Sequence, residues 1–110
     1  MAYDEVLAER IRHVLEGEPG LTERKMFGGL GFMLEGRMAV AAASRGSLMV
    51  RVAPEDAQTW IAEPGVEPME MRGRELRGWL LVEQSALTDD DLLERWVARG
   101  TAHVRALPTG

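Results

Sequence analysis

The sequence contains no cysteine, and this absence excludes a disulfide framework, a thiolate zinc site and a cysteine nucleophile. No segment approaches the roughly 20 consecutive apolar residues that a membrane-spanning helix requires. A secretory signal is not indicated, because charged residues such as Asp4, Glu5 and Arg10 stand where such a signal has an apolar run. We therefore expect a protein of the cytoplasm that has no membrane partner.

What the chain does have is the composition of one folded domain. It has 110 residues and a mass of 12.2 kDa, so a second independent core would leave each half too small to fold alone. Hydrophobic residues make up 45% of the chain and charged residues 28%, which is typical of a globular domain. The formal net charge of −5 argues against a protein that wraps nucleic acid over its whole surface. We expect a single domain over residues 1–110.

The spacing of apolar residues changes along the chain. Leu7 and Ile11 recur at helical spacing, whereas Leu48, Val50 and Val52 alternate as in a strand. The expected elements are a helix over 3–17, strands over 22–27, 30–34, 37–43 and 47–52, a short helix from 54 to 63, strands over 68–72 and 78–82, and a helix over 89–107. The order α-ββββ-α-ββ-α predicts an α+β fold, with an antiparallel sheet that carries its helices mainly on one face.

Local signals mark where these elements begin and turn. Asp4 is the expected N-cap of the first helix, and Pro54 is the expected first residue of the second helix. Thr88 and Asp91 resemble a capping box at the start of the last helix. Tight turns are expected at residues 35–36, 45–46 and 73–74.

Large apolar residues indicate how the helices attach to the sheet. Trp60 and Ile61 are expected to anchor the second helix to the sheet, and all three tryptophans, Trp60, Trp79 and Trp96, are expected in the core. Gly100 interrupts the apolar stripe of the last helix, where it costs about 1 kcal/mol relative to alanine. It is expected to mark a kink or a close contact.

Charge is unevenly distributed. Segments 24–52 and 72–82, which contain most of the expected strands, are net positive, and the other segments are net negative. One interpretation is a basic face that attracts a polyanion; the other is that charged strand edges block edge-to-edge pairing. The few aromatic residues do not fall clearly on this face, so a base-stacking platform is not supported. The basic residues concerned are Arg24, Lys25, Arg37, Arg51, Arg72, Arg74 and Arg77.

Small residues and methionines are expected on the same open face. Met33, Ala39, Ala41 and Met49 all fall at outward positions of the expected strands. Methionine packs adaptably against varied surfaces, so this set favours contact with a protein, including a second copy of the chain as a homodimer. The alternative is that a helix covers these positions. The candidate partner-binding residues are Met33, Arg37, Met49 and Arg51.

No group of residues indicates catalysis, a metal or a cofactor. The glycine-rich run 27–32 lacks the lysine and hydroxyl ending of a P-loop and leads into a strand, so we expect a tight turn or bulge between two core phenylalanines. His13 and His103 have no second metal ligand at helical spacing. The acidic run 89–91 is explained by the start of a helix. We expect a protein that is not an enzyme and has no catalytic, metal or cofactor site.

Several linked motifs together resemble the TfoX (Sxy) N-terminal domain family. They are RKMFGGLGF at 24–32, GRMA at 36–39, LMVRV at 48–52, PM at 68–69, GW at 78–79 and the helix over 96–108. The resemblance covers nearly the whole chain, although the YjbR-like domains share a similar Phe-Gly strand pattern. It implies an α+β fold with a topology related to secretion chaperones, and it implies no catalytic residues.

The resemblance also implies a class of function. The best-known members regulate bacterial competence for DNA uptake, act with the cyclic-AMP receptor protein at some promoters, and carry a second, helical domain. We expect this chain to be a stand-alone N-terminal domain that works as a regulatory or adaptor module, with a transcription regulator as a candidate partner. The alternative is direct binding of nucleic acid through Arg24, Lys25, Arg72, Arg74 and Arg77. A small-molecule binder or an enzyme would need a pocket that sequence cannot show.

Overall fold

A computed structural model describes residues 3–26 and 28–108 of the chain. The expected order of helices and strands is confirmed, with two short 3-10 turns added between them. The elements are α1 (Glu5–Val14), β1 (Leu21–Met26), β2 (Gly29–Leu34), β3 (Arg37–Ala42), η1 (Ser44–Gly46), β4 (Leu48–Arg51), α2 (Pro54–Trp60), β5 (Val66–Met71), β6 (Arg74–Val82), η2 (Gln84–Leu87) and α3 (Asp90–Ala106).

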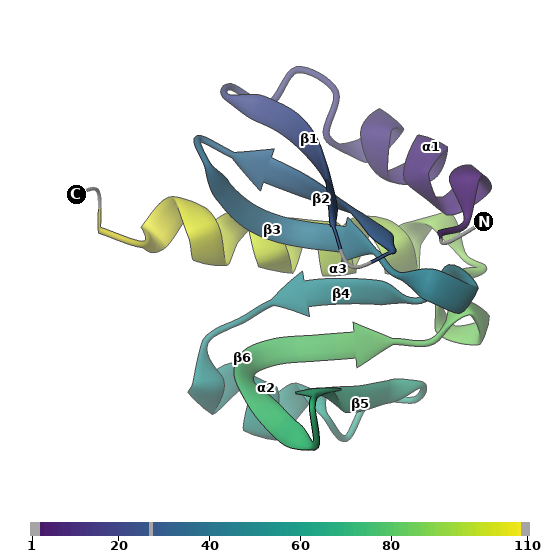
Figure 1. Cartoon of the computed structure of the whole chain (residues 1–110), viewed down its shortest axis with the longest axis vertical. Helices are drawn as coiled ribbons and strands as arrows, with labels where there is room; N and C mark the ends of the chain where they lie inside the picture. The colour runs from purple at the N-terminus through teal and green to yellow at the C-terminus, as the bar shows by residue number, and fades with distance from the viewer. Residues whose placement is uncertain (1–2, 27, 109–110) are drawn as a thin grey trace.

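The strands form one antiparallel sheet, and the helices lie on one side of it. The strand order is β1-β2-β3-β4-β6-β5, so β6 lies between β4 and the edge strand β5. Figure 1 shows α3 running behind the sheet, where it packs on β3 and β4, while α2 lies behind β6. The side of the sheet that faces the viewer carries no helix among the described residues. We call this side the open face, and the other side the covered face.

The hydrophobic core fills the space between the covered face and the helices. Phe32, Val40, Val50 and Leu80 on the sheet are at most 1% exposed, and Trp96 of α3 is 2% exposed. No charged or polar residue is buried within the described part of the chain. The helices are therefore held by the apolar stripes that the sequence predicts.

The start of each helix follows from local chemistry. The Asp4 side chain caps α1 by accepting hydrogen bonds from the backbone N–H groups of Val6, at 2.8 Å, and Leu7, at 3.2 Å. For α3 the predicted capping box is wrong. Asp89 is the N-cap and accepts from the N–H of Asp91 at 2.8 Å.

The Thr88 hydroxyl, one residue before this N-cap, instead donates to the Ser85 carbonyl at 3.5 Å. This bond lies in the turn η2, which sequence periodicity does not reveal. Pro54 is at the start of α2, as predicted. Within residues 3–26 and 28–108, no helix combines the length and the apolar character needed to cross a membrane.

An irregularity in β3 brings α3 very close to the sheet. Phe32 pairs with Val40 and Met33 pairs with Met38, so Ala39 is an extra residue, a β-bulge. The bulge turns Ala39 toward the helices, where it is fully buried beside Val104. A Cβ on Gly100 would lie 2.6 Å from the Ala39 carbonyl oxygen, so Gly100 marks a close contact.

The second helix is attached through one tryptophan and one arginine. The Trp60 and Trp96 rings meet edge to face with centroids 6.0 Å apart. The Arg99 guanidinium lies 4.2 Å from the Trp60 centroid and 4.5 Å from the Trp96 centroid, and it forms an ion pair with Glu63 at 3.0 Å. Ile61 is 38% exposed, so the expectation that it anchors α2 is wrong. Ile61 is the C-cap residue of α2, and its side chain faces solvent.

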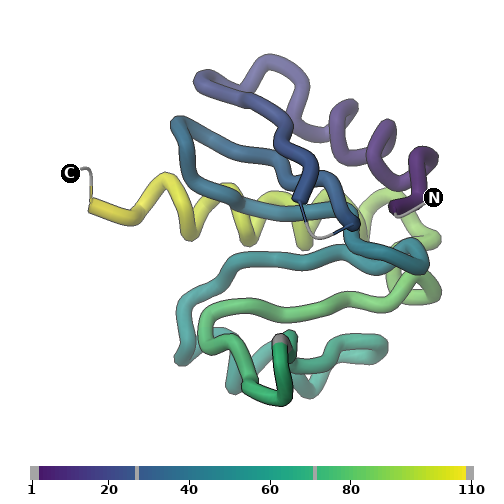
Figure 2. The backbone as a smooth tube through the Cα atoms, viewed as in Figure 1, coloured from purple at the N-terminus to yellow at the C-terminus, as the bar shows by residue number. Residues whose placement is uncertain are grey.

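The turns between strands depend on backbone conformations with positive φ. Glu35 and Gly36 have φ of 52° and 84°, and Arg72 and Gly73 have φ of 54° and 76°, as in type I′ hairpins. The second turn therefore lies one residue earlier than the predicted 73–74. The longer strand β6 bends near Gly78, which has a φ of 85°, and Figure 2 shows the bend in the tube. This bend gives the open face one curved end.

Candidate protein-interaction face

One row of residues crosses the whole open face. The strand register places Arg24 beside Gly31, Gly31 beside Ala41, Ala41 beside Met49, Met49 beside Leu81, and Leu81 beside Glu67. Side chains that are paired across antiparallel strands point to the same side of the sheet. The row therefore runs from a basic residue on the edge strand β1 to an acidic residue on the opposite edge strand β5. We call it the central row.

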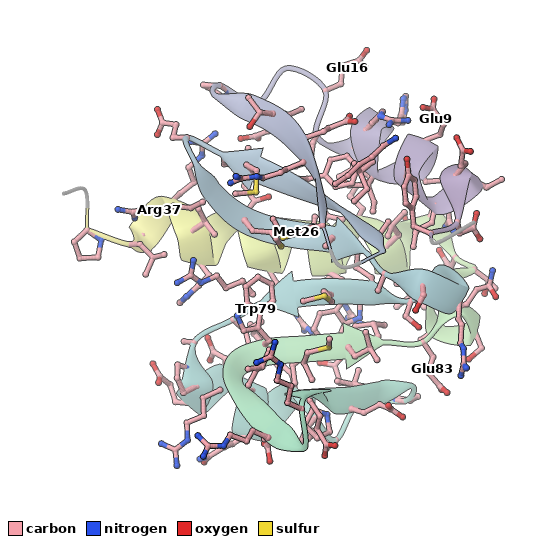
Figure 3. The ribbon with its side chains drawn as sticks, in the orientation of Figure 1. Glu9, Glu16, Met26, Arg37, Trp79 and Glu83 are labelled. Atoms are coloured by element: carbon pink, nitrogen blue, oxygen red, sulfur yellow. The ribbon has the colours of Figure 1, made fainter. Side chains whose placement is uncertain are left out.

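A hollow of about 320 Å³ lies on this face, with a mainly apolar lining. Met26, Met38, Met49 and Met69 line it, and they come from β1, β3, β4 and β5. Its wall includes Trp79 of β6, which lies on the same side of the molecule as Met26 in Figure 3. Topology thus gathers methionines that are far apart in the sequence.

Glycine and alanine form the floor of the hollow. Gly31 and Ala41 both line it, and the end of the Met38 side chain lies over Gly31. A Cβ on Gly31 would stand 2.9 Å from the Met38 Cε atom. Any larger residue at position 31 would displace Met38. The small floor residues therefore leave room that the Met38 side chain partly fills.

Four methionine thioethers and one indole give this surface a definite chemistry. Methionine is unbranched and polarisable, so it can adjust to the shape of an apolar partner. Met49 and Trp79 are half-buried, which leaves apolar area that another molecule can cover. The surface is suited to burying apolar side chains.

The structure places three of the four predicted partner-binding residues on the open face. Met49 and Arg51 lie there on β4, and Met33 lies there on β2, outside the hollow. The Arg51 guanidinium stands 5.9 Å from the centre of the Trp79 ring. Trp79 itself was expected in the core, and that expectation is wrong, because it is half-buried on this face.

Arg37 and Ala39 do not lie on the open face, so the outward positions expected for them are wrong. Arg37 pairs with Leu34, which is buried on the covered face, and its guanidinium donates to the Pro108 carbonyl. Figure 3 shows Arg37 beside the C-terminal end of α3. The bulge at Ala39 changes the side on which the residues before it point. Simple alternation along β3 cannot reveal this change.

Arginines on the helical side of the molecule all have partners. Arg10 pairs with Asp90 at 3.0 Å, and Arg105 pairs with Glu18 at 2.9 Å. Arg12 pairs with Glu9 and Glu23, and its bond to Glu23 is 2.6 Å. Arg95 and Arg99 both pair with Glu63, and Arg105 also pairs with Glu35 at 3.4 Å.

The basic residues of the strands and turns differ from these. Apart from Arg37, which donates to Pro108, they take part in no ion pair or side-chain hydrogen bond within residues 3–26 and 28–108. Among them, Arg24 and Arg51 point to the open face, whereas Lys25 pairs with Leu30 and so points to the covered side. The residues without such a partner are Arg24, Lys25, Arg45, Arg51, Arg72, Arg74 and Arg77.

The predicted nucleic-acid residues fall into two separate places. Arg24 and Lys25 lie on opposite sides of β1. Arg72 lies in the turn between β5 and β6, Arg74 is the first residue of β6, and exposed Arg77 follows on β6. Glu70 and Glu75 pair with each other at the same end of this hairpin. The structure therefore does not bring the five basic residues together into one patch.

Three ionisable groups on the covered side have shifted pKa values, and that of Arg12 is raised, chiefly by its hydrogen bonds to Glu23 and Glu9. The pKa of Glu23 is lowered, chiefly because Arg12 donates hydrogen bonds to its carboxylate. The pKa of His103 is lowered mainly by burial and also by the charge of Arg51, against the opposing charges of Asp56 and Glu55. None of the three groups has a nucleophile or a metal ligand arranged around it in the described structure. The described residues contain no group of three or more side chains that could hold a metal.

The glycine-rich run after β1 acts as a turn with a close contact. Met26 pairs with Gly29, so the chain turns between these two residues, and Gly28 has a φ of 75°. A Cβ on Gly29 would stand 2.7 Å from the Ala42 carbonyl oxygen, so a side chain does not fit there. Phe32 is buried in the core, as predicted. The expected core position of Phe27 lies outside the described residues.

Sequence reasoning missed Met26, Met38, Met69 and Trp79 as residues of the open face. The alternation of β1 could have indicated Met26, since it follows Thr22 and Arg24 at a spacing of two. Met38 and Met69 lie next to register irregularities in β3 and β5, which no local pattern marks. Their common location depends on the order of the strands.

The family model described as the TfoX N-terminal domain matches residues 13–104 of the 110-residue chain. This match includes all six strands, and it extends from the end of α1 into the last turn of α3. Among curated proteins, no relative matches the chain. Because the family model covers most of the sequence, the chain belongs to the TfoX N-terminal domain family, and the resemblance seen in the sequence is confirmed.

Proposed function

We propose that this member of the TfoX N-terminal domain family is a regulatory or adaptor module that binds protein through its open face in the cytoplasm, and that it is not an enzyme. The observation that carries the proposal is the hollow lined by four methionines on the open face, which carries no helix among the residues that the structure describes. A soluble domain gains stability when such a surface is covered, because apolar area contributes about 25 cal/mol per Å² removed from water.

The character of the lining favours a protein over a small molecule. The hollow is lined mainly by apolar side chains from several strands, and its lining has few polar groups that could orient a small molecule. Small-molecule sites bury most of the ligand surface and hold it with a few convergent polar groups. The adjacent Arg24 and Arg51 provide charge at the border of the apolar area, as the polar rim of a protein interface does. A transcription regulator remains our candidate for the class of partner.

The test is protein capture with a carboxylate placed in the hollow. Met49→Glu adds a charge where an apolar partner would be buried, and we expect it to remove bound proteins from a nuclease-treated extract of the native cell. Ala102→Glu adds the same charge on the exposed side of α3 and should leave capture unchanged. Melting curves of both variants check the fold. Equal capture by Met49→Glu and the wild type would contradict the proposal.

Direct nucleic-acid binding is a second candidate. It is favoured by Arg72, Arg74 and Arg77, three exposed basic side chains on the β5–β6 hairpin that form no ion pair within the described structure. It predicts an affinity for DNA or RNA that falls steeply as salt rises, and that disappears when these three residues are changed to Glu. Fluorescence anisotropy with labelled DNA at low salt measures this. No binding at low salt would end this candidate.

A further inference from the structure

We propose that the open face binds a second copy of this chain, face to face, around a two-fold axis that runs parallel to the strands between β3 and β4. This inference rests on the proposed function, because it names the partner of the same surface. Two sheets that pack face to face keep their strands nearly aligned and lie about 10 Å apart. An axis along the strands satisfies this geometry.

The first observation is that the central row is complementary to itself in size. Its order is Arg24, Gly31, Ala41, Met49, Leu81, Glu67. A two-fold axis between β3 and β4 reverses this order in the second copy. Gly31 then faces Leu81 of the other copy, and Ala41 faces Met49. Met49 thus meets the small Ala41, and Leu81 meets Gly31 together with the Met38 side-chain end that lies over it.

The fit around Gly31 is apolar throughout. The flexible end of Met38 lies over Gly31, so Leu81 of the second copy would meet a methionine methyl group. Ala41 is 5% exposed and lies low on the face, whereas Met49 is half-buried and stands higher. Close packing of this kind gives interfaces their shape complementarity.

The second observation is that the row is also complementary to itself in charge. Arg24 stands at one end and Glu67 at the other, and both are exposed. The same axis places Arg24 of each copy against Glu67 of the other, which forms two equivalent ion pairs at the borders. An Arg and a Glu side chain together are long enough to meet across a 10 Å space between sheets. Arg24 has no carboxylate partner within the described part of a single copy.

The neighbouring row is consistent with this arrangement. Met33 pairs with Met38 on one half of the sheet, and Arg51 pairs with Trp79 on the other. Reversal of the row brings the two methionines toward Arg51 and Trp79 of the second copy. Sulfur–aromatic contacts of this kind are favourable. The second copy would then cover Trp79, which packing within one chain leaves half-buried.

The size of the face predicts a reversible dimer. Six strands at a spacing of about 4.8 Å span about 24 Å, and six residues of strand span about 20 Å. The resulting area is below the roughly 800 Å² per partner of a standard stable interface. We therefore expect a dissociation constant in the micromolar range, so that another protein can compete for the same face.

The experiment is sedimentation over a range of protein concentrations, with charge reversals at the two ends of the row. Arg24→Glu and Glu67→Arg each place like charges together twice in a symmetric dimer. We expect each to raise the dissociation constant about tenfold or more. The double variant restores both pairs with reversed polarity and should dimerise like the wild type. Glu94→Arg, on the exposed side of α3, is the matched control and should not change dimerisation.

Mixing the two single variants gives the sharpest result. A heterodimer of Arg24→Glu with Glu67→Arg contains two opposite-charge pairs, so the mixture should associate more tightly than either variant alone. A dissociation constant that is unchanged in both single variants, or a double variant that stays monomeric, would overturn the proposed axis. A wild type that remains monomeric at all concentrations would overturn the dimer.

These outcomes are distinguishable from failure of the proposed function. If the wild type is monomeric but Met49→Glu abolishes capture of cellular proteins, the second-copy inference fails and the protein-binding proposal stands. If Met49→Glu changes neither dimerisation nor capture, both fail. Because residues 24, 67 and 94 are exposed, none of these variants disturbs the core, and thermal unfolding verifies that each is folded.

Discussion

The two faces of the sheet use the same strands but have opposite chemistry. On the covered face, core residues such as Phe32 and Val50 are fully buried, and the arginines of the surrounding helices have carboxylate or carbonyl partners. On the open face, methionines and Trp79 are only half-buried, and Arg24 and Arg51 have no carboxylate partner within the described residues. The covered face is complete within one chain. The open face lacks both apolar cover and countercharge, which is what an interface lacks before its partner binds.

The largest expected effect is a loss of stability when the packing on the covered face is disrupted and the open face is left unchanged. Trp96→Ala removes a buried ring that contacts Trp60 and Arg99, and it should lower the free energy of unfolding by about 3–5 kcal/mol. Met49→Ala removes a half-buried side chain and should cost about 1 kcal/mol. Urea unfolding of both variants measures the contrast. Equal losses of unfolding free energy in the two variants would contradict the conclusion that only the covered face holds the fold together.

A smaller loss is expected where α3 touches the β3 bulge. Gly100→Ala places a methyl group 2.6 Å from the Ala39 carbonyl oxygen and 2.9 Å from Val40 Cγ1. The resulting overpacking should cost about 1–3 kcal/mol and outweigh the gain in helix propensity of about 1 kcal/mol. Ala98→Gly, at an exposed position of α3, measures how much glycine costs relative to alanine where no close contact is present. A Gly100→Ala protein that is more stable than the wild type would show that the helix is not fixed at this contact.

The next effect concerns charge on the covered side. Arg99→Met retains the length of the side chain but loses the cation between the Trp60 and Trp96 rings, and we expect a loss of about 1–2 kcal/mol. Arg95→Met is the control, because Arg95 is more exposed and lies 3.5 Å from Glu63. It should change stability by less than about 1 kcal/mol. Thermal denaturation distinguishes the two, and equal effects would remove the special role of Arg99.

The smallest expected effect concerns the pKa of His103 on α3, which depends in part on Arg51 of the open face. Its pKa is lowered by burial and by Arg51, so the folded chain holds the neutral imidazole and binds the proton less readily than the unfolded chain. Stability should therefore fall as the pH decreases below the unfolded value of about 6.5, and His103→Gln should remove that dependence. Arg51→Gln should raise the pKa of His103 in an NMR titration. An unchanged pKa would show that the charge of Arg51 does not reach α3.

Much of the covered face could be predicted from the sequence. The stripe containing Leu7 and Ile11, the cap at Asp4 and the alternation of Leu48 and Val50 are local patterns, and the structure follows them. Local patterns suffice there because each amphipathic element has a single apolar side to bury. The order of elements and the α+β class follow from the same signals.

The open face could be predicted only in part. Met49 and Arg51 follow from alternation in a regular strand, whereas Arg37 and Ala39 were misplaced because a bulge in β3 breaks alternation. The proximity of Trp79 to Arg51 depends on β6 pairing with β4, and no local signal fixes that pairing. The central row required the full register of six strands. Interfaces built across a sheet are less visible in sequence than cores built along helices.

The most direct measurement of the central claim is an NMR spectrum of methionine methyl groups, recorded as the protein concentration rises and in the presence of captured partner protein. We expect the methyl signals of Met33, Met38 and Met49 to shift, because these residues lie on the face that becomes covered. In a parallel ¹⁵N spectrum, the indole N–H signal of Trp96, which lies in the core, should not change. If the open-face methyl signals stay fixed under both conditions, the open face is not a protein-binding surface.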